Sequence, residues 1–103
     1  MEGRGIERHA SGAVYEGEFK ADKKEGQGTY LYASGRIEVV FYKAGIDVGE
    51  GVMWTADGRS AWQLQDGNQV KTISLEEAKR RVERLGLPMP VRREGKWAAG
   101  QRG

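Results

Sequence analysis

Residues that could carry out chemistry are few in this sequence, and they are scattered. His9 is the only histidine and there is no cysteine, which excludes thiolate catalysis and cysteine-based metal sites. No Ser/His/Asp arrangement or metal-ligand spacing is present, and no two carboxylates stand out as an acid and base pair. We therefore predict no catalytic residues, no metal and no cofactor, and we expect that the chain is not an enzyme.

A set of aromatic residues is the first candidate for binding. Its members are Tyr15, Phe19, Tyr30, Tyr32 and Tyr42. On one face of a sheet these rings could form a shallow groove for a peptide or a lipid. They could instead stack across strands and serve only to hold the sheet together. A single-layer sheet allows both roles, because one of its faces stays partly open.

A set of basic residues is the second candidate. Its members are Lys79, Arg80, Arg81, Arg84, Arg92 and Arg93, with Lys96 and Arg102 further along the tail. Such a cluster could hold the head groups of anionic lipids. Alternatively, Glu76 with Arg80 and Glu77 with Arg81 have the i,i+4 spacing of a solvated helix face. Trp97 could be an interfacial anchor or part of a linker, and the sequence leaves both open.

Composition narrows the class of protein. The net charge of +2, from 17 basic and 15 acidic residues, is too small to indicate nucleic-acid binding. No apolar run is long enough to span a membrane, and the N-terminal residues lack the apolar core of a signal peptide. We expect a cytoplasmic protein, located either free or at the periphery of a membrane or the cytoskeleton.

A repeat of 23 residues organises the chain. Nine of the 16 glycines fall on three columns of this period: Gly3, Gly26 and Gly49; Gly5, Gly28 and Gly51; Gly12, Gly35 and Gly58. Within a unit, residues 14–20 alternate between polar and apolar, residues 21–26 are polar, and residues 28–32 form a second apolar segment. Each unit is therefore a β-hairpin. We predict a mainly β fold, an elongated single-layer antiparallel sheet of repeated hairpins.

The pattern resembles a known repeat family. The first unit has Gly-x-Gly-x6-Gly-x2-Tyr-x-Gly-x-Phe at Gly3, Gly5, Gly12, Tyr15, Gly17 and Phe19, and this is similar to the MORN repeat. The second unit departs at Glu38 and Val40, where the family has Tyr and Gly. The third has Ala61, Gln63 and Gln65, so the resemblance covers about residues 3–68 and weakens along the chain. The last unit and the segment after it also resemble the ends of MORN arrays in algal and other protist proteins.

The resemblance implies an interaction module. MORN arrays are associated with phospholipids, with protein partners and with self-association, and they occur as accessory segments of larger enzymes such as lipid kinases. A groove of the family type would centre here on Tyr15, Phe19, Tyr30 and Tyr42. We expect a non-catalytic scaffold that binds a protein or peptide on its aromatic face. The alternatives are a peripheral membrane module for anionic phospholipids and an accessory domain of a larger enzyme.

Beyond the repeats, residues 74–87 are predicted to form a helix that caps the array. Ser74 to Glu77 has the sequence of a capping box, and Gly86 and Pro88 are typical of a helix end. Leu75, Ala78, Val82 and Leu85 form an apolar stripe. Continuing the repeat, we expect this stripe to pack on Val39, Phe41, Trp54, Trp62 and Leu64. The domains are then the array at 1–73, the helix at 74–87 and a flexible basic tail at 88–103.

The other end of the array has no comparable cover. Residues 3–10 correspond to the second strand of a repeat, and Arg4, Glu7 and Arg8 give this edge a charged character. An edge-to-edge homodimer is therefore one prediction of the sequence.

Overall fold

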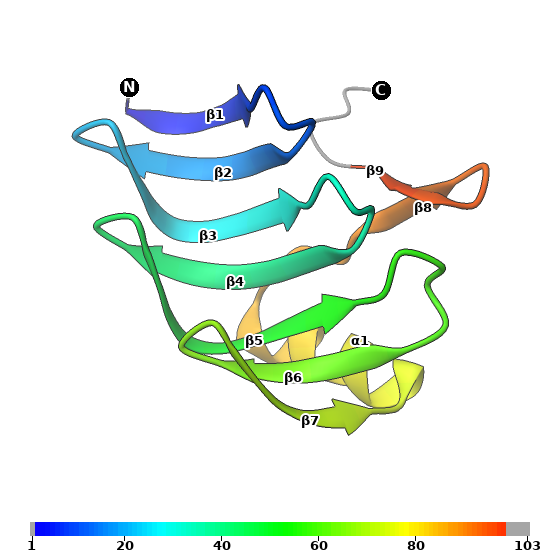
Figure 1. Cartoon of the computed structure of the whole chain (residues 1–103). Coiled ribbons are helices and arrows are strands. Elements are labelled where there is room, and N and C mark those ends of the chain that lie inside the picture. The colour runs from blue at the N-terminus through cyan, green and yellow to red at the C-terminus, as the bar shows by residue number, and fades with distance from the viewer. Residues whose placement is uncertain (1, 99–103) are drawn as a thin grey trace.

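Strands dominate the computed structural model, which describes residues 2–98 (Figure 1). In these residues, seven strands form one antiparallel sheet in which each strand pairs with its neighbours in sequence. Their bounds are β1 Gly3–Arg8, β2 Val14–Lys20, β3 Lys23–Leu31, β4 Ile37–Lys43, β5 Ile46–Trp54, β6 Ala61–Gln65 and β7 Asn68–Ile73. A helix, α1 (Leu75–Leu85), and a small hairpin of β8 (Val91–Arg93) and β9 (Lys96–Ala98) follow. The prediction of a hairpin sheet with one C-terminal helix is confirmed.

The turns on one side of the sheet repeat the same hydrogen bonds. His9 N–H donates to the carbonyl of Ala13 at 2.9 Å, and Tyr32 N–H donates to that of Arg36 at 2.9 Å. In the third turn Thr55 N–H donates to Ser60, at 3.0 Å, so this turn is one residue longer. The strands after this turn, β6 and β7, are therefore shifted by one residue from the positions that a 23-residue period gives.

The longer turn overturns part of the predicted packing. Tyr30 pairs with Glu38, but the equivalent Met53 pairs with Trp62, which is 24 residues and not 23 from Glu38. Because side chains alternate between faces, a shift of one residue moves every side chain of a strand to the other face. Trp62 and Leu64 therefore lie with Tyr15 and Met53. The prediction that they pack beneath the helix was wrong.

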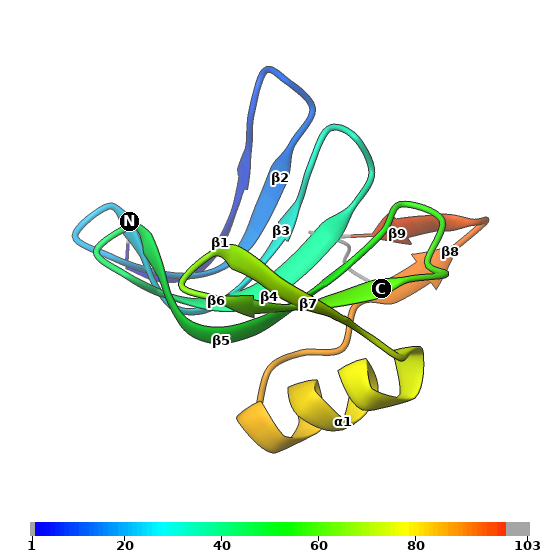
Figure 2. The ribbon, with the colours of Figure 1, turned by 60° about the horizontal axis from the view of Figure 1, so that its bottom comes forward.

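The helix covers one face of the sheet, under the end formed by β5 to β7 (Figure 2). Ala78 and Val82 are buried in one cluster with Val39 and Trp54, and Phe41 packs against it, as predicted. Ser74 Oγ accepts the N–H of Glu77 at 3.0 Å, and Gly86 ends the helix in a left-handed conformation, at φ 73°. Leu75, assigned to the apolar stripe, is instead 44% exposed at the first turn.

The segment predicted as a flexible tail includes a second, small sheet in its described part. Residues 91–98 form the β8–β9 hairpin, while residues 99–103, including Arg102, lie outside the described residues. Trp97 anchors the hairpin because its ring is buried against Trp54, with centroids 5.8 Å apart, and its indole N–H donates to Thr55 O at 2.7 Å. Trp97 thus belongs to the core beneath the sheet, together with the helix.

Candidate functional site

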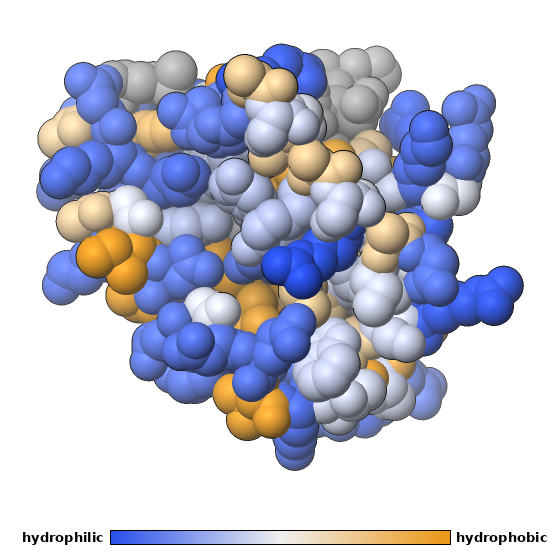
Figure 3. All heavy atoms as spheres, viewed as in Figure 1, coloured by the Kyte–Doolittle hydropathy of each residue, from blue (hydrophilic) through white to orange (hydrophobic). Residues whose placement is uncertain are grey.

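The face without the helix carries a second, smaller core. Figure 3 shows this face as mostly hydrophilic, with apolar side chains in separate small patches. Beneath that surface lies a cluster of buried side chains, with Tyr30 and Trp62 packed at its margin. The buried members are Tyr15, Phe19, Val40, Tyr42, Met53 and Leu64.

Tyr15 is the centre of this cluster and is fully buried. Its ring meets Phe19 and Tyr42 edge to face, with centroids 5.2 and 5.3 Å apart, and its hydroxyl donates to Glu18 O at 3.1 Å. The ring lies over the paired glycines Gly17 and Gly28. A Cβ at Gly28 would lie 2.8 Å from Tyr15 Cζ, so this glycine serves close packing and not an unusual backbone angle.

The five aromatic residues singled out in the sequence therefore divide into two groups. Tyr15, Phe19 and Tyr42 are buried and stack across strands, the structural role left open above. Tyr30 and Tyr32 are partly exposed, and their rings lie 4.8 Å apart. Of the five, these two offer surface to a partner.

Lys24 lies over the buried tyrosines. This position of Lys24 was not predicted from the sequence. Its ammonium lies 5.2 Å from the ring centroid of Tyr15 and 5.9 Å from those of Tyr30 and Tyr42. It is also 3.7 Å from a carboxylate oxygen of Glu7. The ring faces attract the cation, so Lys24 closes this part of the cluster.

Glu38 is the unusual residue of this face, since it takes the position that Tyr15 has one repeat earlier. It is 4% exposed, and the Tyr32 hydroxyl donates to its Oε1. Within residues 2–98 its buried Oε2 has no hydrogen-bond donor, and the Asp47 carboxylate lies beside the group. Burial raises the pKa of Glu38 to about 7; the Tyr32 hydrogen bond and Arg36 lower it, whereas Asp47 adds to the rise.

A pocket of about 280 Å³ opens next to Glu38. The β6–β7 hairpin forms one side of it through Gly67, Asn68 and Gln69. The remaining lining residues are Tyr32, Arg36, Glu38, Met53 and Leu64. The pocket thus has a buried carboxyl group, two amides and two apolar side chains within one small space.

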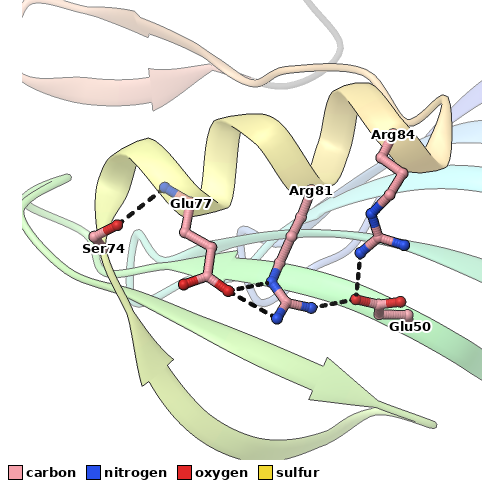
Figure 4. A network of polar contacts seen from close by, with 5 residues as sticks. All are labelled: Glu50, Ser74, Glu77, Arg81 and Arg84. Atoms are coloured by element: carbon pink, nitrogen blue, oxygen red, sulfur yellow. Dashed lines mark hydrogen bonds and ion pairs between the residues drawn. The ribbon is translucent and has the colours of Figure 1, made fainter.

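The basic residues of α1 do not form one free surface (Figure 4). Arg81 contacts Glu50 of β5 and also pairs with Glu77 at 2.8 Å, the predicted i,i+4 contact. Arg84 pairs with Glu50 at 3.0 Å. The hydrogen bond from Arg81 lowers the pKa of Glu77. Lys79 and Arg80 remain exposed.

The two arginines of β8 differ from one another. Arg92 stacks on Trp97 at 4.5 Å and donates to Ala56 O and Gly95 O, at 3.2 and 2.6 Å. Arg93 is exposed. Three of the six predicted lipid-binding residues, Arg81, Arg84 and Arg92, are thus held in contacts within the chain.

Other groups add no reactive centre in the described part of the chain. His9 lies 6.0 Å from the Tyr30 ring, and its Nε2 is 3.5 Å from Glu7. Within residues 2–98, no three side chains of the types that bind metals come together. No helix among these residues combines the length and apolar character needed to cross a bilayer.

Comparison with known families supports the repeat assignment. Residues 15–35, which cover all of β2 but its first residue, all of β3 and most of the following turn, match the family model for the MORN repeat. The chain carries a MORN repeat. The MORN repeat is a protein- or membrane-interaction module, and its family is generally non-catalytic. No curated protein gives a significant match to the chain.

Proposed function

We propose that this MORN array is a non-catalytic interaction module that binds a protein partner on the face without the helix. The observation that carries the proposal is the unequal covering of the sheet. Helix α1 and the β8–β9 hairpin close one face, whereas the other keeps Tyr30, Tyr32 and Trp62 partly exposed. Tyrosine and tryptophan are enriched where proteins bind one another.

The buried cluster beneath these rings also supports a role in binding. Tyr15, Tyr42 and Met53 are buried together, and the partly exposed rings of Tyr30 and Trp62 pack against them. A surface that is already ordered loses little conformational entropy when a partner binds. The same packing explains why much of an aromatic array can be buried and still serve recognition.

A binding experiment with matched variants tests this proposal. The double variant Tyr30→Ala/Tyr32→Ala removes the exposed rings, and Lys79→Ala/Arg80→Ala removes two exposed cations from the helix. A partner isolated with the wild-type chain is purified, and its affinity for each form is measured by calorimetry. The aromatic variant should weaken binding by about tenfold or more, which corresponds to ~1.4 kcal/mol, while the helix variant should bind normally. The reverse pattern would refute the proposal.

Attachment to an anionic membrane is the weaker alternative, because intramolecular contacts engage half of the basic residues it would use. Co-sedimentation with anionic and neutral liposomes, at low and at high salt, separates the two functions. Membrane attraction through Lys79, Arg80 and Arg93 would be specific for anionic vesicles and would fade as salt shortens the Debye length to ~3 Å at about 1 M. Binding of that kind, lost in Lys79→Ala/Arg80→Ala, would favour the membrane function.

A further inference from the structure

The first strand, β1, is the more regular of the two edges of the sheet. Its residues pair with β2 in unbroken register from Gly3 to Arg8. The other edge, β7, is interrupted by a bulge at Val70, next to Lys71. Bulges and lysines on an edge strand hinder pairing with a further strand. Of the two edges, β1 is therefore the one better suited to continue the sheet.

The outer side of β1 carries backbone groups that can accept a further strand. Among residues 2–98, β2 is the only strand that pairs with it (Figure 1). In an antiparallel ladder the N–H and C=O groups of alternate residues point to opposite sides of a strand, so those of every second residue in β1 point away from β2. The strand contains no proline, which would remove a donor. An extended segment of another protein could therefore add to this edge.

The repeat indicates which side chain such a segment needs. Gly5 corresponds to Gly28 one repeat later, and Gly28 pairs with Gly17 beneath the ring of Tyr15. Tyr15 belongs to the preceding strand and stands two residues before Gly17. The same arrangement, moved back by one repeat, places a ring of the added strand over Gly5. Because Gly5 has no positive φ, its backbone conformation does not require glycine, and the close approach of a ring is the role that Gly28 indicates for it.

The opposite face of β1 determines the charge of the segment. Arg4, Ile6 and Arg8 lie on the face that carries the helix, where Ile6 packs against the core and both arginines are exposed. Acidic residues opposite the two arginines and an apolar residue opposite Ile6 would form favourable cross-strand pairs there. A second copy of the chain is the poorer occupant, because neither β1 nor β7 contains an aromatic residue to place over Gly5.

We propose that β1 binds an extended acidic segment of a partner protein, which adds to the sheet as an antiparallel strand with an aromatic ring over Gly5. The backbone hydrogen bonds of the ladder contribute affinity, and the ring fixes the register. Arg4 and Arg8 select for acidic side chains and increase the rate of association. This edge is a second interaction surface, beyond the face proposed above, and its use does not require Tyr30 or Tyr32.

Nuclear magnetic resonance of the ¹⁵N-labelled chain tests the inference with a capped peptide, acetyl-Thr-Glu-Tyr-Val-Gly-Glu-Thr-amide. In the register of β2 on β3, moved back by one repeat, its tyrosine lies opposite Glu7 and its glycine opposite Gly5. Its two glutamates then lie opposite Arg8 and Arg4. One control peptide carries serine in place of tyrosine, and the other carries lysine in place of both glutamates. We expect saturable shifts of the backbone amide signals of β1 with the tyrosine peptide, and binding of each control about tenfold weaker or more.

Variants of the chain test the ring and the charges separately. Gly5→Ala places a methyl group beneath the ring and should weaken binding of the tyrosine peptide by about tenfold or more. Arg4→Ala/Arg8→Ala should also weaken it at low salt, and this loss should shrink as salt screens the charges. The matched control Lys79→Ala/Arg80→Ala removes two exposed cations from α1 and should bind the peptide as the wild type does. The control peptides are measured on the wild-type chain, so the test does not depend on the folding of any variant.

Four results would overturn the inference. They are the absence of saturable shifts, equal binding of the serine peptide, unchanged binding in a folded Gly5→Ala variant, and shifts of the β1 signals that grow with the concentration of the chain without peptide. The last result would assign this edge to a second copy. The peptide should also bind Tyr30→Ala/Tyr32→Ala normally, since loss of binding there would place it on the aromatic face. Each failure leaves the proposed function to be judged by its own experiment with the purified partner.

Discussion

A single carboxyl group, that of Glu38, should make the stability of this array depend on pH. In the first repeat the equivalent position holds Tyr15, and burial raises its pKa to about 12, so it stays neutral at physiological pH. Glu38 sits at the same depth, next to Tyr32, Arg36 and Asp47, and burial raises its pKa to about 7. Between about pH 4.5 and about pH 7, the folded chain therefore holds a proton here that the unfolded chain has already released.

The pKa of Glu38 gives a stability prediction with a definite sign. Between about pH 4.5 and about pH 7 the folded state binds more protons than the unfolded state. The contribution of Glu38 to the free energy of unfolding therefore falls as pH rises. Glutamine does not titrate. As pH rises through this window, the free energy of unfolding of Glu38→Gln should therefore increase relative to that of the wild type, by at most ~3 kcal/mol. Above the window this difference should stay constant. Thermal melts at a series of pH values measure the gain.

The control for this prediction is Glu76→Gln, a change of the same type on the exposed surface of α1. Its melting temperature should follow that of the wild type at each pH. If Glu38→Gln also follows the wild type throughout, the pKa of Glu38 is the same in the folded and the unfolded chain, and the folded chain does not retain the proton.

Gly28 supports a second prediction at the scale of single residues. In Gly28→Ala the new Cβ would lie within 2.8 Å of Tyr15 Cζ, and Tyr15 has no free space into which to move. Overpacking of this kind costs roughly 1–3 kcal/mol. Chemical denaturation should show this loss, and it should shrink when Tyr15 is shortened to leucine in both members of the comparison. An equal loss with leucine would mean that the clash lies in the backbone.

At the scale of elements, the turns explain where prediction from sequence failed. The period of 23 residues correctly placed the hairpins. The prediction of a turn over residues 21–26 was wrong, because β3 already begins at Lys23 and the turn holds only two residues. The period also misplaced Trp62 and Leu64, because the third turn holds one residue more and the period alone cannot detect it. Ala61 and Trp62 are adjacent apolar residues, so the sequence from Ala61 to Leu64 offers an apolar side chain to either face. Only the pairing of Met53 with Trp62 decides between them.

Helix α1 provides a prediction for this scale. Val82 is 1% exposed, so Val82→Asp would bury a charge without a partner and should lower stability by roughly 3 kcal/mol or more. Leu75→Asp places the same change on the stripe predicted from sequence, but at an exposed position in the first turn. Its melting temperature should stay close to that of the wild type. A large loss in Leu75→Asp would show that the stripe packs as the sequence suggested.

For the whole molecule, helix α1 and the β8–β9 hairpin together cover one face of the sheet. Only the helix could be predicted from the sequence. The helix was predictable because its caps and apolar stripe are local signals. The β8–β9 hairpin was not, since its two strands have three residues each and its order depends on distant contacts of Trp97 with Trp54 and Thr55. The depth of Tyr15 and Tyr42 was equally hidden, because side chains from other strands, among them Met53, Leu64 and Lys24, pack around them.

Trp97 should contribute to the stability of the entire fold. Trp97→Ala removes the anchor of the hairpin and exposes Trp54, which should cost about 3 kcal/mol or more. Trp97→Phe keeps an aromatic ring but loses the N–H bond to Thr55, and a smaller cost of about 1 kcal/mol is expected. Calorimetric unfolding of both variants measures this order. Wild-type stability in Trp97→Ala would mean that the hairpin does not hold the core.

The two edges of the sheet leave the assembly state open to experiment. Among the described strands, β1 and β7 each pair with one neighbour, so both edges are available. The edge-to-edge homodimer stays a prediction, and light scattering during size-exclusion chromatography should show the mass rising with concentration. A constant monomer mass would remove it.

The contact between Trp54 and Trp97 also gives the molecule an optical signature of its own. Two indoles at 5.8 Å and tilted by 53° couple their electronic transitions, and such a pair produces a split circular-dichroism band. Trp62 lies on the opposite face and does not take part in the pair. The split band should therefore report only on the packing of the β8–β9 hairpin against the sheet. If the split band disappears on warming at a lower temperature than the circular-dichroism signal of the strands, the β8–β9 hairpin detaches first. The seven-stranded sheet then remains folded without it over a range of temperatures.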